Sequence, residues 1–122
     1  MKKVLIVDDS ALMRRMMRNI LTGNGYEIAG EAHNGALGVS KYKELMPDIV
    51  TMDLVMEGMS GLDALSIIID INPDANVIMV SSMGQDIIVR DAIMRGAKSF
   101  IVKPYSEKQV MNAFKRILKL RP

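Results

Sequence analysis

Short, mostly apolar runs that each end at a polar side chain recur along this chain, and they restrict its fold more than any other feature. Four of these runs cover residues 4–7, 49–52, 77–80 and 99–102, and the polar residues that follow them are Asp8, Asp53, Ser81 and Lys103. Uninterrupted apolar runs of this length are typical of strands that are buried on both faces. Such strands occur in parallel sheets that are covered by helices on both sides.

Helical patterns separate these runs. After Ser10, apolar residues follow helical spacing as far as Leu21, and glycines then end the pattern. Further helices are expected from the N-cap Asn34 to about residue 46, over residues 62–69 and 86–95, and after the capping box of Ser106 and Gln109. Residues 26–31 alternate like a short strand. Five strands that alternate with five helices predict an α/β fold with a doubly wound, five-stranded parallel sheet.

The composition limits the class of protein. The chain has 122 residues, 49% of them hydrophobic and 25% charged, which predicts one soluble domain over residues 1–122. It has no cysteine, so disulfides and thiolate metal sites are excluded. The apolar run behind Lys2 and Lys3 ends at Asp8, too soon for a signal peptide or a membrane span, so we expect a cytoplasmic protein without a membrane partner. Its formal charge of +2 is spread out and few aromatic side chains accompany it, so we expect no nucleic-acid partner.

The polar strand ends predict a ligand site. In a doubly wound sheet the carboxyl ends of parallel strands share one edge, and ligands bind there. Each residue alone would be a helix cap or a loop residue, but together Asp8, Asp9 and Asp53 form an oxygen-only set that suits Mg²⁺. Mg²⁺ and Lys103 would offset the three carboxylate charges. A phosphoryl group could then approach Asp53 as its nucleophile, and Ser81 could donate a hydrogen bond to a phosphoryl oxygen.

The whole chain resembles a response-regulator receiver domain, and among these the single-domain chemotaxis regulators. The motifs that carry the resemblance are Val7-Asp8-Asp9-Ser10, Thr51-Met52-Asp53, the Met56…Met59…Gly61 loop, Val80-Ser81-Ser82-Met83-Gly84, Gly96-Ala97 and Phe100-Ile101-Val102-Lys103-Pro104. The resemblance implies a flavodoxin-like sheet with the strand order 2-1-3-4-5.

The resemblance also implies roles for residues at the site. Asp53 would accept a phosphoryl group from a phosphohistidine of a sensor histidine kinase. Asp8, Asp9, Asp53 and the backbone carbonyl of Val55 would hold Mg²⁺. Lys103 would contact the phosphoryl group, helped by a cis peptide bond between Lys103 and Pro104. The domain would catalyse its own phosphorylation and slow dephosphorylation only, so it would not be an enzyme with turnover.

A switch is implied as well. Ser81 would be drawn toward the phosphoryl group while Phe100 turns inward, and this would remodel the surface of the fourth helix, fifth strand and fifth helix. The expected partner at this surface is a flagellar motor switch component or another output protein. We expect a monomer, because no element is predicted to have an unburied apolar face.

Two apolar residues and the methionines lead to further hypotheses. In receivers the positions of Val55 and Met83 flank the path of the attacking water; both are apolar here, which predicts slow self-dephosphorylation. The twelve methionines divide into core filler and an adaptable partner surface. We assign Met13, Met16 and Met17 to the core, and Met56, Met59, Met83, Met94 and Met111 to the partner surface.

Other classes of protein share the strand-end acids or the topology of the sheet. A haloacid-dehalogenase-type phosphatase needs a second acid two residues after its nucleophile, where this chain has Val55. A flavin or nucleotide module needs a glycine-rich phosphate loop, where this chain has Asp8 and Asp9. A larger regulator, such as a chemotaxis methylesterase, is the alternative within the receiver family. The absence of a linker at residues 120–122 favours a single-domain protein.

Overall fold

The computed structural model describes residues 2–119 and confirms the predicted alternation of strands and helices. The elements are β1 (Lys3–Val7), α1 (Ala11–Gly23), β2 (Glu27–Ala32), α2 (Gly35–Leu45), β3 (Ile49–Asp53), α3 (Gly61–Ile71), β4 (Val77–Ser81), α4 (Asp86–Met94), β5 (Ser99–Val102) and α5 (Glu107–Lys119). All strand pairs are parallel, in the order β2-β1-β3-β4-β5. The prediction for residues 120–122 lies outside the described part of the chain.

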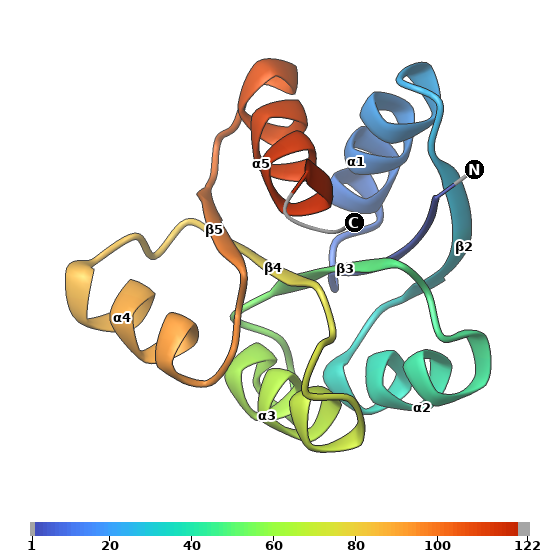
Figure 1. Ribbon diagram of the computed structural model, residues 1–122. Helices are drawn as coiled ribbons and strands as arrows, with labels where there is room; N and C mark the ends of the chain where they lie inside the picture. The colour runs from blue at the N-terminus through green and yellow to red at the C-terminus, as the bar shows by residue number, and fades with distance from the viewer. Residues whose placement is uncertain (1, 120–122) are drawn as a thin grey trace.

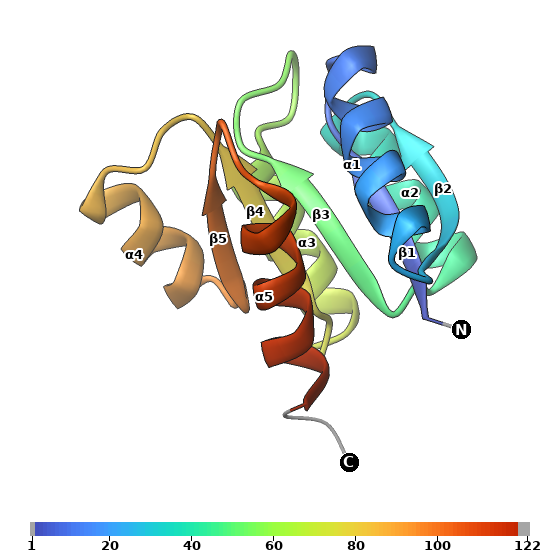
Figure 2. The same cartoon turned by 90° about the horizontal axis from the view of Figure 1, so that it is seen from above.

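The helices cover both faces of the sheet. In Figure 1, α1 and α5 lie on one face, and α2, α3 and α4 lie on the other. Figure 2 shows β2 at one edge of the sheet and β5 at the other, with α4 beyond β5. None of the helices in residues 2–119 combines the length and the apolar character that a bilayer-spanning helix needs.

Burial on both faces explains the uninterrupted apolar run of β1. Val4 and Ile6 belong to the core under α1 and α5, which also contains Phe114. Leu5 and Val7 belong to the opposite core, under α2 and α3. Successive side chains of a strand point to opposite faces, so both positions of the alternation are apolar here.

Side-chain caps start α1, α2 and α5 within a few residues of the strands that precede them. The Oγ of Ser10 accepts a hydrogen bond from the N–H of Met13 at 3.2 Å. Asn34 caps α2 in the same way, and Ser106 and Gln109 form the reciprocal capping box that the sequence predicts. Because all strands are parallel, the polar residues at their carboxyl ends lie along one edge of the sheet.

The assignment of the methionines is partly wrong. Met16, expected in the core, is 42% exposed, because α1 turns it toward solvent beside the segment after β5. Met56 and Met111, expected on a partner surface, are each only 7% exposed. The loop after β3 folds Met56 onto the core under α2 and α3, and Met111 lies on the buried face of α5. Met83 and Met94 are exposed as expected.

The expectation that no element has an unburied apolar face is also wrong. In α4, Ile87 is 79% exposed and Met94 is 83% exposed. Ala92 is the buried residue of this helix. Val102 of the adjacent strand β5 is exposed as well. The sequence pattern of α4 is apolar on more than one side, and only one side packs on the sheet.

Candidate functional site

The carboxyl ends of β1, β3 and β5 bring three charged side chains together. The Nζ of Lys103 lies 2.9 Å from Oδ2 of Asp8 and 3.6 Å from Oδ1 of Asp53. Asp8 is 6% exposed and Asp53 is 7% exposed. Two nearly buried carboxylates therefore share one ammonium group, and the Lys103–Pro104 peptide bond that follows is cis, as predicted.

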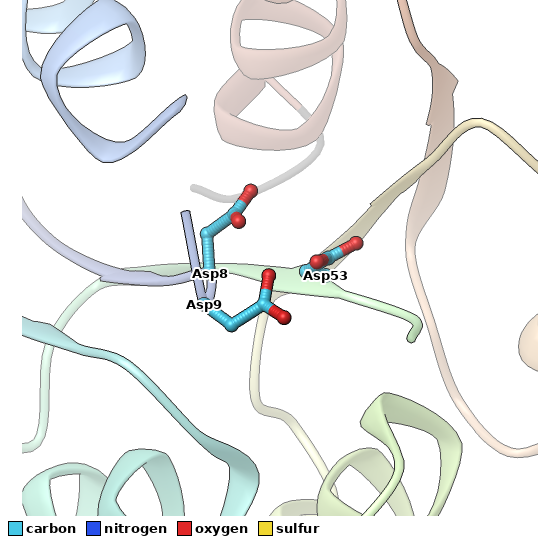
Figure 3. A group of neighbouring side chains, drawn as sticks. All are labelled: Asp8, Asp9 and Asp53. Carbon is cyan, nitrogen blue, oxygen red and sulfur yellow. The ribbon is translucent and has the colours of Figure 1, made fainter. Parts of the chain in front are cut away.

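Asp9 completes a cluster of three acids. Asp8, Asp9 and Asp53 each offer one carboxylate oxygen, and these oxygens lie within 4.8 Å of one another. Figure 3 shows the three side chains gathered at the end of β3, with Asp8 above the ribbon of this strand and Asp9 below it. Asp9 is exposed. The donor set fits a hard divalent cation that keeps several water ligands, because it offers oxygen atoms and remains open to solvent.

The electrostatics of the pocket also favour a bound cation. Burial, first, and the charge of Asp8 raise the pKa of the Asp53 carboxyl, Lys103 lowers it, and the resulting pKa is about 6. The single ammonium group thus does not offset the burial and the neighbouring acid. A cation bound by these carboxylates would favour the ionised form of Asp53.

A close backbone approach also shapes the site, and the sequence does not predict it. A Cβ atom at Gly61 would lie 2.0 Å from the carbonyl oxygen of Asp53. The N–H of Gly61 donates to the carbonyl of Leu54 at 2.8 Å. The start of α3 is thereby held against the end of β3. Glycines are common near loops, and nothing in the sequence shows which backbone segment Gly61 contacts.

The other predicted residues lie at or near the same edge. Ser81 is 1% exposed at the end of β4, and its Oγ accepts a hydrogen bond from the N–H of Met83 at 3.1 Å. Its hydroxyl proton remains for another acceptor. Val55 is 60% exposed on the loop after β3. Phe100 is half-buried in β5 and packs against the core under α2 and α3.

Comparison of the chain with known protein families identifies its family. The model of the response regulator receiver domain matches residues 4–115. This chain belongs to the response regulator receiver family. This chain has Val55 where the phosphatase family needs an acid, and Asp8 and Asp9 where a nucleotide-binding module needs a glycine-rich phosphate loop. The receiver family therefore replaces both alternative interpretations.

Similar proteins agree on a chemotaxis-related, CheY-like receiver of a two-component response regulator. The chemotaxis protein CheY of Thermotoga maritima is 53% identical over 118 residues, which are 97% of this chain and 98% of that protein. The protein-glutamate methylesterase/protein-glutamine glutaminase of the same organism is 40% identical over 84% of this chain, but the match covers 30% of that protein. A chain in the crystal structure of the CheX–CheY–BeF3–Mg²⁺ complex from Borrelia burgdorferi has a TM-score of 0.94 and 38% identity, covering 96% of this chain and 89% of that one.

Receiver domains bind Mg²⁺ in an acidic pocket, and the aspartate cluster is a pocket of this kind. The family also fits a protein that is not a classical enzyme.

Proposed function

We propose that this receiver domain accepts a phosphoryl group on Asp53 from a phosphohistidine of a sensor histidine kinase. A carboxylate oxygen of Asp53 attacks the phosphorus atom, the P–N bond breaks, and its electron pair returns to the imidazole nitrogen. The observation that carries the proposal is the cluster of Asp8, Asp9 and Asp53, in which Asp8 and Asp53 also pair with the ammonium group of Lys103. An acyl phosphate formed on Asp53 would remain on the protein as a mark of the signal.

Each side chain of the pocket has a proposed role. Asp8, Asp9, Asp53 and the backbone carbonyl of Val55 would hold Mg²⁺. When bound, Mg²⁺ supplies positive charge that offsets the carboxylates and the phosphoryl oxygens. Lys103 donates from its ammonium group to a phosphoryl oxygen, since its Nζ already lies 3.6 Å from Asp53. The pocket is therefore suited to a dianionic group only with its cations in place.

The proposed readout is a change of surface. Ser81 turns its hydroxyl toward the phosphoryl group, Phe100 moves inward, and the surface of α4, β5 and α5 changes for an output protein, such as a flagellar motor switch component. The exposed Ile87 and Met94 give this surface apolar side chains for a partner. CheY of the Borrelia complex is bound to CheX, which supports binding as the mode of output. We place the protein in the cytoplasm, where a histidine kinase would act on it.

Intact-mass measurement tests the phosphotransfer proposal. The chain is incubated with acetyl phosphate and Mg²⁺, in parallel with Asp53→Asn and with an EDTA control. We expect the parent chain alone to gain one phosphoryl group. A folded parent chain that gains none would reduce Asp53 to a structural carboxylate, and the proposal would be wrong.

A second candidate is the receiver of a chemotaxis methylesterase. The 40% identity to the Thermotoga methylesterase supports this candidate, and the 53% identity to the CheY protein supports a stand-alone regulator more strongly. The mass of the native gene product separates the two, because a methylesterase would carry a further catalytic domain.

A further inference from the structure

Arg14, in the first turn of α1, reaches back to the junction between β1 and α1. Its Nη1 donates to the carbonyl oxygen of Asp8 at 2.7 Å. Its Nε donates to Oε1 of Glu31, near the end of β2, at 3.2 Å. The Arg14 side chain is 20% exposed and that of Glu31 is 26% exposed. One guanidinium group therefore joins the first turn of α1, the end of β2 and the backbone beside the aspartate cluster.

The carbonyl that Arg14 holds belongs to the peptide group between Asp8 and Asp9. This group is planar, so a donor that fixes the oxygen also fixes the direction in which the chain leaves toward the Cα of Asp9. A hydrogen bond from a charged donor is stronger than one from a neutral donor. Arg14 thus acts on the backbone from which Asp9 projects.

The two neighbouring acids depend on this backbone to different degrees. The carboxylate of Asp8 accepts hydrogen bonds from the N–H of Ser10 at 2.9 Å and from Lys103 at 2.9 Å. Within residues 2–119, no hydrogen bond or ion pair holds the exposed carboxylate of Asp9. The backbone is therefore what places Asp9 beside Asp8 and Asp53.

We propose that Arg14 is a positioning residue for divalent-cation binding, which it favours by fixing the peptide group between Asp8 and Asp9. Glu31 holds the guanidinium in the required place. This inference rests on the proposed function, because it assumes that the aspartate cluster holds Mg²⁺.

The sign of the effect separates positioning from simple electrostatics. Arg14 is a cation next to a cluster of acids, so loss of its charge alone would strengthen Mg²⁺ binding. Loss of the contact with the Asp8 carbonyl would weaken Mg²⁺ binding, because Asp9 would no longer be placed in advance.

Arg18 provides a matched control on the same helix. Its Nε donates to Oε2 of Glu31 at 2.7 Å, as Arg14 does to Oε1, but within residues 2–119 Arg18 makes no hydrogen bond or ion pair with Asp8. Arg14→Met and Arg18→Met each remove one positive charge and one partner of Glu31. Only Arg14→Met removes the hydrogen bond to the Asp8 carbonyl.

Calorimetric titration of the full chain with MgCl2, after removal of metal ions, is the test. We expect Arg14→Met to raise the Kd for Mg²⁺ about tenfold, the lower end of the effect of losing a group that orients metal ligands, because loss of the positive charge acts in the opposite direction. Arg18→Met should change it by less than about twofold, as is usual for exposed ion pairs. The proposal is overturned if Arg14→Met binds Mg²⁺ as tightly as the parent, or if Arg18→Met weakens binding equally.

Two further measurements keep the outcomes apart. Phosphorylation by acetyl phosphate should need more Mg²⁺ in Arg14→Met but reach the parent's maximal rate. If Arg14→Met does not fold, Glu31→Ala, which leaves the charge of Arg14 in place but removes the carboxylate that holds its guanidinium group, is titrated instead, and a parent-like Kd overturns the proposal. A parent chain that binds no Mg²⁺ contradicts the proposed function itself, whereas equal binding by parent and Arg14→Met contradicts only the role of Arg14.

Discussion

At the scale of single residues, the ionised carboxylate of Asp53 destabilises the metal-free fold. Burial, with the charge of Asp8 acting in the same direction, raises the pKa of this carboxyl from 3.8 to about 6. Between these two values the folded state binds more protons than the unfolded state, so this group makes the free energy of unfolding fall as the pH rises through that window. Above the upper value the full penalty is present.

Asp53→Asn should therefore stabilise the metal-free protein at neutral pH. We expect the free energy of unfolding in EDTA to rise by about 1 to 2 kcal/mol at pH 7.5, and the gain to shrink as the pH falls toward about pH 4. Urea unfolding of parent and variant across this range measures the effect. A loss of stability at neutral pH would mean that the pairing with Lys103 outweighs the burial of Asp53.

Val55 and Met83 bear on the lifetime of the proposed acyl phosphate. Both are exposed and apolar, and neither can orient a water molecule by a hydrogen bond. Val55→Asn or Met83→Glu should accelerate loss of the phosphoryl group by up to about tenfold, the equivalent of one hydrogen bond in the transition state. Intact mass, followed after removal of acetyl phosphate, gives the rates. Val55→Leu is the apolar control, and two polar variants no faster than the parent would contradict the hypothesis.

At the scale of elements, the contact between β3 and α3 leaves no space for a side chain. Gly61→Ala should lower the free energy of unfolding by about 1 to 3 kcal/mol or more, because the added Cβ overlaps the carbonyl of Asp53. Gly23→Ala is the matched control, since a Cβ there meets nothing within 4 Å. Urea unfolding of both variants measures the difference. Equal stabilities would show that the start of α3 moves away without penalty.

The helix α4 is anchored at one end. Gln85 at its N-terminus makes no side-chain capping hydrogen bond. At its C-terminus, the Nη1 of Arg95 donates to the carbonyl of Leu62 and to the Oγ of Ser66, both at 3.3 Å. The end of α4 that starts after the Ser81 loop is thus the less restrained one.

At the scale of the whole molecule, a ligand that binds only the folded state stabilises it. Mg²⁺ at one hundred times its Kd should raise the free energy of unfolding by about 2.7 kcal/mol. Thermal unfolding with increasing MgCl2 should show a rising Tm for the parent chain and a much smaller rise for Asp9→Asn, whose exposed side chain has little structural role. A Tm that Mg²⁺ does not change would contradict a metal site at the aspartate cluster.

The sequence predicts the sheet and the aspartate cluster well, because both follow from local patterns. Apolar runs that end at Asp8, Asp53 and Lys103 are enough to place these residues at one edge of a parallel sheet. Contacts between distant segments leave no such pattern. The hydrogen bond from Arg14 to the Asp8 carbonyl and the approach of Gly61 to Asp53 both depend on the final packing of helices on the sheet.

Because α4 is weakly attached, it can move locally while the sheet and the other helices keep their packing. The two cores hold the sheet together with α1, α2, α3 and α5, and α4 adds the buried Ala92 and the partly buried Ile88. Displacement of α4 would expose little apolar surface, so it would cost little of the free energy of unfolding. Amide hydrogens of α4 would then exchange with solvent through local motion, whereas those of β1 and β3 would exchange only when the whole domain unfolds. The proposed phosphorylation site would then lie in the rigid part of the chain, and the proposed output surface in the part that moves.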